Sequence, residues 1–495
     1  MNSKGPKPAV LGIGGTDPSS GAGAYLDNRV LHALGVHGCA VTSVVTAQNS
    51  DGVTHFAPVC DLAFGAQLDS VFTEFSPRVV KAGLLGGPAQ CTLLGQRLDR
   101  GQRLVWDPVL ASSSGASFLG VEDMRQGMRR LEGKIELFTP NIPEASRITG
   151  IAITDHGSMV RAAACLAEMG IENVVIKGGH GDFSPTECQD LFYGRNECFW
   201  VITDRVGRGH CVRGTGCTFA SAVAAAMAQG HEVRDAVVLG RSVVSRGIES
   251  SYELGRMRFQ GASAWPTSYR TFPVVRYGSK PAPGENGFSR CDGHRLGVYP
   301  VVDSAHWVKR LLETGIRTIQ LRMKTGGPGV WEREIKTAVQ LADRFGARLF
   351  INDHWRLAIR YHAYGVHLGQ EDLRSADLGS IASAGVRLGV SVHGFCDMAA
   401  AIDIDPSYIA VGPVFESASK RMDVAPQGVE KVRFWAGFLE QRWPLVAIGG
   451  INIECARRLL DTGVGSIAMI AAITRSPDYV AASREFIELW EKNTV

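Results

Sequence analysis

Residues 206–227 read Val-Gly-Arg-Gly-His-Cys-Val-Arg-Gly-Thr-Gly-Cys-Thr-Phe-Ala-Ser-Ala-Val-Ala-Ala-Ala-Met. Gly214 and Gly216 flank Thr215, which predicts a tight turn whose backbone N–H groups point toward one place. The small residues that follow favour a helix, so these N–H groups also lie at a helix N-terminus. A turn of this kind binds phosphate oxygens. The stretch therefore predicts an anion site at the start of a helix.

Cys217 falls in the first turn of that helix. The positive end of the helix dipole is expected to lower the pKa of a thiol at this position. The thiolate could then accept a proton from a substrate hydroxyl while the turn holds the negative charge that develops. The alternative is a glycine turn that packs a helix against a sheet, with Cys217 as a small core residue. These residues alone leave both interpretations open.

The composition predicts an ordinary soluble protein of two domains, because 495 residues exceed the size of a single core. The net charge of +3 gives no reason to expect a nucleic-acid or membrane partner. The eleven cysteines form no Cys-x-x-Cys pair, which argues against disulfides and thiolate zinc sites and fits a reducing compartment. Since no apolar signal core or membrane-spanning run is present, we expect a cytoplasmic protein.

Short apolar runs in the first half end in polar residues, as parallel strands covered by helices on both faces do. The first run leads into a glycine loop with Asp17, which suits a small polar ligand. The second ends at Gln48, whose amide could recognise a heteroaromatic ring or could cap a turn. Carboxylates near a phosphate site usually imply Mg²⁺, and a lysine neutralises phosphate. The later runs supply such residues: Asp107, Asn141, Glu144 and Lys177.

Six motifs occur in order: Gly15-Thr-Asp-Pro-Ser-Ser-Gly-Ala-Gly, Ala47-Gln-Asn, Gln67-Leu-Asp-Ser-Val-Phe, Thr139-Pro-Asn-Ile-Pro-Glu-Ala, Lys177-Gly-Gly-His and Gly214-Thr-Gly-Cys. Together they resemble hydroxymethylpyrimidine (phosphate) kinase, a ribokinase-like enzyme of thiamine synthesis. The resemblance implies a three-layer α/β/α domain over residues 1–262 that uses ATP and Mg²⁺. It implies that Gln48 recognises the aminopyrimidine, that Asp17 lies at the substrate, and that Cys217 is the catalytic base.

The same resemblance assigns the anion hole and the ATP phosphates to Gly214, Thr215, Gly216, Lys177, Asn141, Glu144 and Asp107. Two positions depart from the family pattern. Arg213 replaces the usual His, and a guanidinium is still a good partner for an oxyanion. Ala24-Tyr-Leu-Asp27 replaces Ile-Gln-Ala-Asp, so Tyr25 changes the expected substrate contacts.

Residues 263–290 are rich in proline, glycine and serine, which predicts a linker without a packed element. After it, eight short apolar runs begin at residues 296, 318, 348, 365, 387, 408, 444 and 466, separated by helical patterns. Eight strand–helix units in about 200 residues predict a (β/α)₈ barrel over 291–495. In that fold the functional residues lie at the carboxyl ends of the strands.

Polar residues collect at those strand ends in three sets. Asp353 and Asp372 are hard oxygen ligands that suit Mg²⁺. Arg322, Lys324 and Lys420 supply positive charge, and Ser417 and Ser419 supply hydroxyl donors, which together suit a diphosphate. Gln320, Asn352 and Ser391 also end predicted strands. A monophosphate site is expected at Gly449, Gly450, Ile470 and Ala471. Zinc is disfavoured, because the spacing of His354, His362, His367 and His393 matches no metal helix.

These motifs resemble thiamine-phosphate synthase over nearly all of residues 295–475. The resemblance implies a Mg²⁺-assisted loss of pyrophosphate from hydroxymethylpyrimidine diphosphate and capture of the pyrimidine cation by the nitrogen of thiazole phosphate. It also implies that the diphosphate and its pyrimidine are held by Gln320, Arg322, Lys324, Asn352, Ser391 and Lys420. The thiazole phosphate would be held by Ser417, Ser419 and the 449–450 and 470–471 pairs. Ser417-Ala-Ser419 replaces Thr-x-Thr and keeps both hydroxyls, whereas Ala471 replaces the usual Ser.

The sequence therefore predicts a bifunctional enzyme whose first half makes the diphosphate that the second half consumes. Two alternatives stay open: only the barrel is catalytic and the first half is a pyrimidine-binding or assembly module, or the first half has a pyridoxal-kinase-like activity. The expected partners are small molecules, namely hydroxymethylpyrimidine and its phosphates, thiazole phosphate and ATP. We also expect a homo-oligomer.

Overall fold

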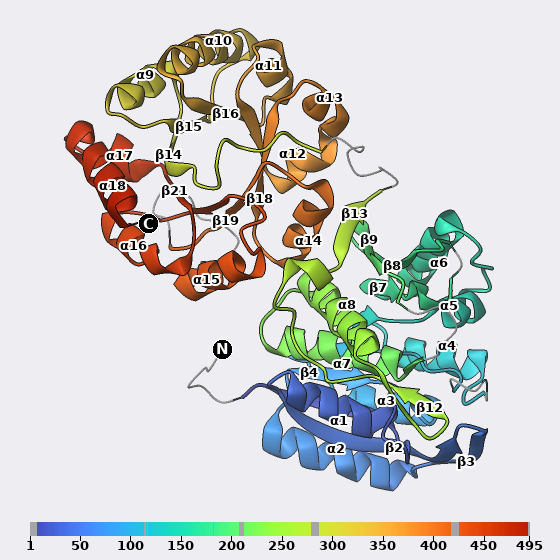
Figure 1. The fold of residues 1–495 in the computed structure, drawn as a ribbon. Coiled ribbons are helices and arrows are strands. Elements are labelled where there is room, and N and C mark those ends of the chain that lie inside the picture. Colours follow the sequence, from blue (N-terminus) through green and yellow to red (C-terminus); the bar gives the residue numbers. More distant parts are fainter. Residues whose placement is uncertain are drawn as a thin grey trace. The chain divides into compact units, whose positions relative to one another are not determined.

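The computed structural model describes residues 7–112, 115, 117–181, 183–206, 212–278, 287–416 and 425–493. The chain divides into two compact units (Figure 1). The first unit comprises Met1–Pro266 and Thr271–Ser279, and the second comprises Thr267–Arg270 and Lys280–Val495. The predicted boundaries at residues 262 and 291 stay predictions. Within the described ranges, no helix has the length and apolar character needed to cross a membrane.

The first unit is built on a ten-stranded sheet in the order β13-β9-β8-β7-β6-β5-β4-β1-β2-β3. Its parallel strands are β1 (Ala9–Gly15), β2 (His37–Asn49), β4 (Val79–Ala82), β5 (Arg103–Trp106), β6 (Ile135–Phe138) and β7 (Asn173–Ile176). Antiparallel strands extend both edges: β3 (Gly52–Pro58), β8 (Glu187–Gly194), β9 (Cys198–Asp204) and β13 (Val274–Tyr277). The parallel strands coincide with the apolar runs in the sequence.

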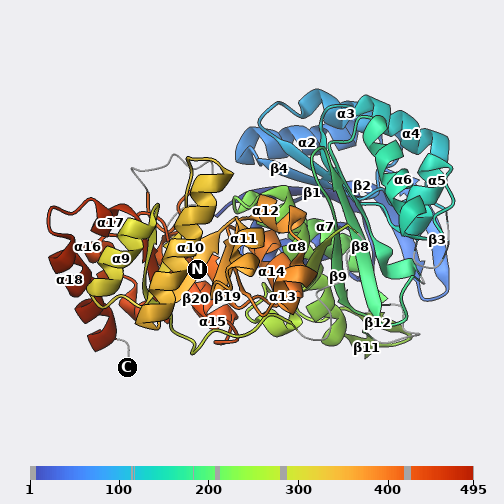
Figure 2. The ribbon, with the colours of Figure 1, turned by 90° about the horizontal axis from the view of Figure 1, so that it is seen from above.

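Helices cover both faces of this sheet (Figure 2). One layer contains α1 (Gly23–Ala33), α7 (Thr215–Ala228) and α8 (Val233–Glu249), which pack on one another. The other contains α2 (Asp61–Phe75), α3 (Pro88–Arg97), α4 (Val121–Arg130), α5 (Ile142–Thr149) and α6 (His156–Glu168). Apolar side chains of this second layer and of the sheet form one buried core that includes Phe64, Trp106 and Phe138. The three-layer α/β/α prediction is confirmed.

A small second sheet positions the start of α7. Its strands are β11 (Tyr252–Leu254), β12 (Met257–Phe259) and β10 (Val212–Arg213), and β10 pairs in parallel with β12. Since β10 ends immediately before the turn at Gly214, the pairing fixes where the side chain of Arg213 leaves the backbone.

Part of the predicted linker is packed. Residues 274–277 form β13, which pairs with β9 (Val275 with Val201), so the prediction that this segment lacks a packed element was wrong. The short run Val-Val-Arg-Tyr has high β propensity, and it covers an otherwise open sheet edge. Nearer the start of the linker, Tyr269–Thr271 is a short 3₁₀ turn (η2). Arg270, which belongs to the second unit, donates from Nε to Glu440 of the same unit at 2.7 Å.

The second unit is a closed barrel of eight parallel strands, as predicted. They are β14 (Gly297–Val302), β15 (Thr318–Leu321), β16 (Arg348–Asn352), β17 (Gly365–Leu368), β18 (Arg387–Val392), β19 (Tyr408–Val411), β20 (Leu445–Ile448) and β21 (Ser466–Met469). The first and last strands pair with each other, Gly297 with Ser466, and this pairing closes the ring. Tyr299, Phe350 and Tyr408 fill the interior with smaller apolar residues, so the barrel is a packed core.

Helices surround the barrel strands (Figure 1). They are α9 (Ala305–Glu313), α10 (Pro328–Phe345), α11 (Trp355–Arg360), α12 (Gln370–Ser375), α13 (Leu378–Ser383), α14 (Phe395–Ile404), α15 (Gly428–Phe438), α16 (Ile453–Arg457), α17 (Ala471–Thr474) and α18 (Tyr479–Asn493). Short turns complete the unit, among them Leu460–Thr462 (η3); the first unit has a similar turn at Gly178–His180 (η1).

Candidate active sites

A cavity of about 390 Å³ lies at the carboxyl ends of the parallel strands of the first unit. Ligands of open α/β sheets bind at this edge. The cavity brings together nearly all the residues predicted for the first half: its lining includes Gln48, Asp107, Asn141, Glu144, Lys177, Gly214, Thr215, Gly216 and Cys217. Asp17 is fully buried and reaches this group through Arg213, which also lines the cavity.

One wall of the cavity carries a hydrogen-bonded triad of Asp17, Arg213 and Gln48. Arg213 donates to Asp17 Oδ2 through Nε at 3.1 Å and Nη2 at 3.0 Å, and its Nη2 also donates to Gln48 Oε1 at 2.6 Å. Ser19 donates to the other oxygen of Asp17 from its backbone N–H and its hydroxyl. The buried carboxylate is thus paired, and the Gln48 carbonyl is already occupied. Arg213, which replaces the usual His of the family pattern, makes all three of these hydrogen bonds.

The turn at residues 214–216 needs its first glycine, and a side chain at its second would crowd Lys177. Gly214 has φ +82° and is the N-cap of α7, and a Cβ there would lie 2.2 Å from the carbonyl oxygen of Gly21. A Cβ on Gly216 would lie 3.2 Å from Lys177 Nζ. The first glycine therefore allows the turn, and the second leaves the lysine room beside the helix N-terminus. The left-handed turn and the helix N-terminus that the predicted anion site requires are both present, and the binding of an anion there stays a prediction.

Cys217 is partly buried beside this turn, and its pKa is not lowered. Burial raises the pKa of the Cys217 thiol to about 11; Lys81 opposes this rise, and the carboxylates of Asp27 and Asp107 add to it. The prediction of a low thiol pKa was therefore wrong, because loss of water and two nearby carboxylates outweigh the helix dipole.

The ion pair of Lys81 and Asp27 lies next to the thiol, and Lys81 was not predicted from the sequence. Lys81 Nζ lies 2.7 Å from Asp27 Oδ2 with both side chains buried, and Ser221 of α7 donates to the other oxygen of Asp27 at 2.8 Å. Lys81 also lines the cavity. A lysine in the middle of the apolar run Val-Val-Lys-Ala was the signal that could have identified it, since buried lysines are rare unless paired.

A second ion pair lies beside the turn at Gly216. Lys177 Nζ lies 2.5 Å from Asp107 Oδ1, which also accepts from the Thr139 hydroxyl at 3.2 Å. Asn141 and Glu144 form a capping box on α5, in which each side chain accepts from the other's backbone N–H. Burial raises the pKa of Glu144 to about 7, with Lys177 opposing the rise and Asp107 adding to it. Asn141 and Glu144 thus stabilise the start of α5, in addition to any role in binding.

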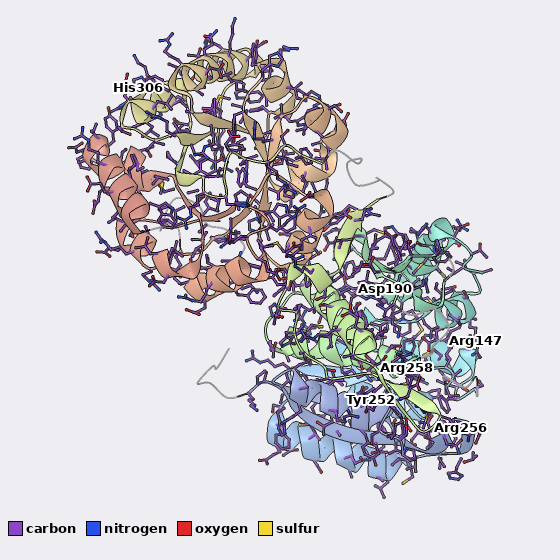
Figure 3. The ribbon with its side chains drawn as sticks, viewed as in Figure 1. Arg147, Asp190, Tyr252, Arg256, Arg258 and His306 are labelled. Carbon is purple, nitrogen blue, oxygen red and sulfur yellow. The ribbon has the colours of Figure 1, made fainter. Side chains whose placement is uncertain are left out.

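Two further charged side chains line the cavity and are labelled in Figure 3: Arg147 on α5 and Asp190 on β8. Asp190 Oδ1 accepts from the backbone N–H of Gly178 at 2.7 Å, and its other oxygen lies 3.5 Å from a nitrogen of Arg241. Neither residue was predicted. Asp190 lies on β8, an antiparallel strand, whereas the prediction considered only the ends of parallel strands.

The second unit pairs two carboxylates at the carboxyl ends of β16 and β17. The side chains of Asp353 and Asp372 lie in hydrogen-bonding reach of each other. Burial raises the pKa of Asp353 to about 6, and the negative charge of Asp372 adds to the rise while Arg322 opposes it. Asp353 also has φ +64°, a strained value for a residue other than glycine. The structure thus brings the two predicted metal ligands together.

Gln320 and Ser391 lie at the two ends of a buried chain of hydrogen bonds inside the barrel. Gln320 Nε2 donates to the Tyr299 hydroxyl at 3.4 Å, and the hydroxyls of Tyr299 and Tyr408 lie 2.9 Å apart. His367 Nδ1 lies 2.7 Å from the Tyr408 hydroxyl, and its Nε2 lies 2.9 Å from Ser391 Oγ. Tyr299 and Tyr408 were not predicted from the sequence, and His367 was considered only for zinc.

The other predicted barrel residues lie at the strand ends or in the loops that follow them. Asn352 ends β16, Arg322 and Lys324 follow β15, and Lys324 is exposed. Gly449 and Gly450 have φ of +105° and +67°, and a Cβ on Gly450 would lie 2.4 Å from the carbonyl oxygen of Glu416. Ile470 is the N-cap of α17, which begins at Ala471. Ser417, Ser419 and Lys420 lie outside the described residues.

Comparison with known proteins gives a separate result for each unit. The phosphomethylpyrimidine kinase family profile matches residues 17–261, and the thiamine monophosphate synthase profile matches residues 298–473. The thiamine-phosphate synthase of Cronobacter sakazakii is 52% identical over 196 residues, which is 40% of this chain and 93% of that protein. The phosphomethylpyrimidine kinase structure from Clostridium difficile is 32% identical, with 47% of this chain and 96% of that chain covered and a TM-score of 0.41.

A pyridoxal kinase structure from Staphylococcus aureus, in complex with ADP, has the same fold as the first unit. It has a TM-score of 0.50 and 24% identity, and the match covers 55% of this chain and 98% of that chain.

Proposed function

The chain belongs to the thiamine-phosphate synthase family through its second unit and carries a phosphomethylpyrimidine kinase domain as its first, and from this premise we propose how each site performs its part. The first unit phosphorylates 4-amino-5-hydroxymethyl-2-methylpyrimidine and its monophosphate with ATP. The second unit joins the resulting diphosphate to thiazole phosphate and releases pyrophosphate and thiamine monophosphate. The alternatives in which only the barrel is catalytic, or the first half acts on pyridoxal, are not favoured.

One observation carries the kinase proposal: a single cavity joins a polar wall that suits a heteroaromatic ring to a helix N-terminus that suits phosphate. The triad at Arg213 would contact the pyrimidine, and the turn at 214–216 would hold the phosphoryl group being transferred. Lys177 would neutralise ATP phosphate oxygens, and Glu144 and Asp107 would help to hold the Mg²⁺ that accompanies ATP. Cys217 is the proposed proton acceptor.

The paired carboxylates support a Mg²⁺ site in the barrel. A Mg²⁺ site needs only one or two carboxylates plus substrate phosphates. Asp353 and Asp372 provide two, and their mutual repulsion, seen in the raised pKa of Asp353, is what a divalent cation would relieve. Bound there, Mg²⁺ would stabilise pyrophosphate as a leaving group. Within the described residues no group of three His, Cys, Asp or Glu side chains could hold a metal ion alone, which fits a site completed by the substrate.

The chain itself supplies positions for the substrates. Arg322 lies close enough to Asp353 to affect its pKa, so its guanidinium would contact the diphosphate beside the metal. The backbone N–H groups at Gly449, Gly450 and the start of α17 would hold the thiazole phosphate. Ala471 contributes no hydroxyl there, so the backbone carries this contact. A homo-oligomer remains our expectation for the assembly.

The test is a coupled assay on the purified chain. With ATP, Mg²⁺ and hydroxymethylpyrimidine, mass spectrometry should detect the mono- and diphosphate with matching ADP release. Addition of thiazole phosphate should then produce thiamine monophosphate. If the diphosphate forms only when a separate kinase is added, the first unit is not the kinase, and the bifunctional proposal fails.

A further inference from the structure

The cavity wall formed by Asp17, Arg213 and Gln48 has a fixed direction of hydrogen-bond donation. A guanidinium carries only N–H donors, so the Gln48 atom that faces Arg213 Nη2 at 2.6 Å is the carbonyl Oε1. The amide Nε2 of Gln48 then faces the Thr46 hydroxyl at 3.2 Å. That hydroxyl gives its single proton to the backbone carbonyl oxygen of Thr16 at 2.6 Å, so it accepts from Gln48. Both ends are fixed by groups that can act in only one way.

The acceptor atoms of this wall are occupied, whereas some of its donors are free. Arg213 bonds twice to one oxygen of the fully buried Asp17, and Ser19 bonds to the other oxygen. Arg213 also occupies Gln48 Oε1. Within the described residues, the second N–H of Gln48 Nε2 and the N–H groups of Arg213 Nη1 have no partner, and both side chains line the cavity. The wall therefore offers a ligand N–H donors and no free side-chain carbonyl.

The fold holds Arg213 in this position without a ligand. Arg213 is in register with Phe259 in the small sheet, and a Cβ on Gly21 would lie 2.7 Å from the Phe259 ring and 2.9 Å from Arg213 Cδ. Tyr252, which is labelled in Figure 3, stacks on Phe259 with ring centroids 5.8 Å apart. Gln260 Nε2 lies 3.5 Å from the backbone carbonyl oxygen of Arg213. The occupied Gln48 carbonyl is thus a feature of the folded unit.

We propose that Arg213 is a specificity-determining residue: because it occupies the Gln48 carbonyl, this wall binds an acceptor atom of the substrate ring and does not bond the exocyclic amino group. The inference rests on the kinase function proposed for the first unit and narrows it. A ring nitrogen of the pyrimidine would accept from Gln48 Nε2. The amino group would find no free side-chain acceptor in the wall.

A further activity follows from this arrangement. The first unit would also phosphorylate hydroxymethylpyrimidines in which hydrogen replaces the amino group. The hydroxymethyl oxygen would form a bond to the γ-phosphorus of ATP, and the bond from that phosphorus to the bridging oxygen would break and release ADP. The hydroxyl proton would go to Cys217, the proposed acceptor for the amino compound as well. The substrate class is thus the hydroxymethyl heteroaromatic alcohols with a ring acceptor.

The experiment measures selectivity at the kinase site of the full-length protein. Release of ADP gives kcat and KM for 4-amino-5-hydroxymethyl-2-methylpyrimidine and for the analogue in which hydrogen replaces the amino group. This assay counts only transfer from ATP, so binding at the barrel does not contribute. We expect kcat/KM values within about threefold of each other, because removal of a group that the wall does not bond leaves none of its polar atoms unpaired.

Arg213→Lys separates the charge of Arg213 from its forked shape. A lysine keeps a positive charge beside the buried Asp17 but lacks the fork that bonds Asp17 and Gln48 together. The Gln48 carbonyl can then accept from an amino group, so the preference for the amino compound should rise to about tenfold or more, mainly through KM. Arg97→Lys is the matched control, because Arg97 makes a similar fork to Asp69, at 2.6 and 2.9 Å, and is not among the residues that line the cavity. It should leave the preference unchanged.

Gln48→Met covers the case in which Arg213→Lys does not fold. Methionine has the length of glutamine and neither an N–H donor nor a carbonyl, so KM should rise by a similar factor, about fivefold, for both compounds. A loss confined to the amino compound would show that Gln48 recognises the amino group and would overturn the inference. A wild-type preference of about tenfold or more, or a preference that Arg213→Lys leaves unchanged, would overturn it too.

Binding without ATP separates this inference from the proposed function. Calorimetry on the wild type and on Arg213→Lys gives the affinities for the same two compounds. A chain that binds both but transfers no phosphate would refute the proposed kinase, and the ratio of affinities would still test the inference. A chain that binds neither compound would overturn both.

Discussion

Asp372→Asn should stabilise the metal-free protein at neutral pH and weaken its response to Mg²⁺. The substitution keeps the shape of the side chain and removes one of two carboxylates that lie within hydrogen-bonding reach of each other. An asparagine can donate an N–H to Asp353, so the contact between positions 353 and 372 survives without repulsion. A residue proposed as a metal ligand would thus be unfavourable for the fold when no metal is bound.

The magnitude follows from the pKa of Asp353, which is raised from 3.8 to about 6. The folded protein therefore holds a proton that the unfolded chain releases, so the stabilisation from this group is complete below about pH 4 and is lost as the pH rises through 6. Two pKa units correspond to about 3 kcal/mol. Burial is the largest cause, Asp372 the second, and Asp353 is partly exposed, so we assign about 1 kcal/mol to the repulsion.

The assay is thermal unfolding of the full chain at pH 7.5 and at pH 4.5, in EDTA and in Mg²⁺. In EDTA at pH 7.5, Asp372→Asn should raise the Tm of the barrel transition by about 2–4 °C, and the gain should shrink at pH 4.5. Added Mg²⁺ should raise the Tm of the wild type more than that of the variant, since a ligand stabilises by RT ln(1 + [L]/Kd).

Glu371→Gln is the control, because it removes a neighbouring charge from the same first turn of α12. It should reproduce neither the gain in EDTA nor the loss of the Mg²⁺ response. In activity assays, Asp372→Asn should raise the Mg²⁺ concentration for half-maximal thiamine phosphate formation and leave pyrimidine phosphorylation unchanged. A lower Tm for Asp372→Asn in EDTA at pH 7.5, together with an unchanged Mg²⁺ requirement, would refute the reasoning and make both aspartates ordinary loop residues.

Three further outcomes are expected. Cys217→Ala should lower kinase turnover by ~10²–10⁴ and leave the synthase rate intact, and a loss below about fivefold would make Cys217 a packing residue. Arg213→Met leaves the fully buried carboxylate of Asp17 without its ion pair, so urea unfolding should show a loss of about 3–5 kcal/mol, with partial recovery in Arg213→Lys; equal stability of all three proteins would contradict this. A fragment of residues 1–278 should be more soluble than one of 1–262, because β13 covers the edge of β9; equal behaviour would show that the edge needs no cover.

The parallel strands and the residues at their ends could be predicted, because both depend on local pattern and one rule of geometry. A continuous apolar run indicates a strand buried on both faces, and the carboxyl ends of parallel strands meet at one edge. This is why Asp353 and Asp372 could be paired from the sequence alone, although a helix and a strand separate them along the chain. The same rule placed Asp107 and Lys177 at one cavity, where they lie 2.5 Å apart.

Contacts between elements far apart in the chain could not be predicted in this way. Arg213 contacts Asp17 and Gln48 across 196 and 165 residues, and β10 reaches that position only through a strand pair that starts at Val212. The hydrogen bonds inside the barrel could not be predicted from the sequence for a related reason. Tyr299, His367 and Tyr408 stand inside apolar runs and resemble ordinary core residues until the closed sheet turns their side chains toward one another.

The error at Cys217 was one of magnitude. A helix N-terminus favours a negative charge by about 0.3–1 kcal/mol, and by ~2 in a favourable buried geometry. Burial raises the pKa of the thiol from 9.0 to about 11, which corresponds to about 3 kcal/mol, and Asp27 and Asp107 act in the same direction. Burial therefore outweighs the helix dipole. At pH 7 the thiolate fraction is on the order of 10⁻⁴. A proton acceptor at this position thus depends on positive charge beyond that of Lys81, whose own partner is Asp27. The Mg²⁺ that accompanies ATP would supply this charge, because the nucleotide phosphates are anions and would themselves raise the pKa of the thiol further.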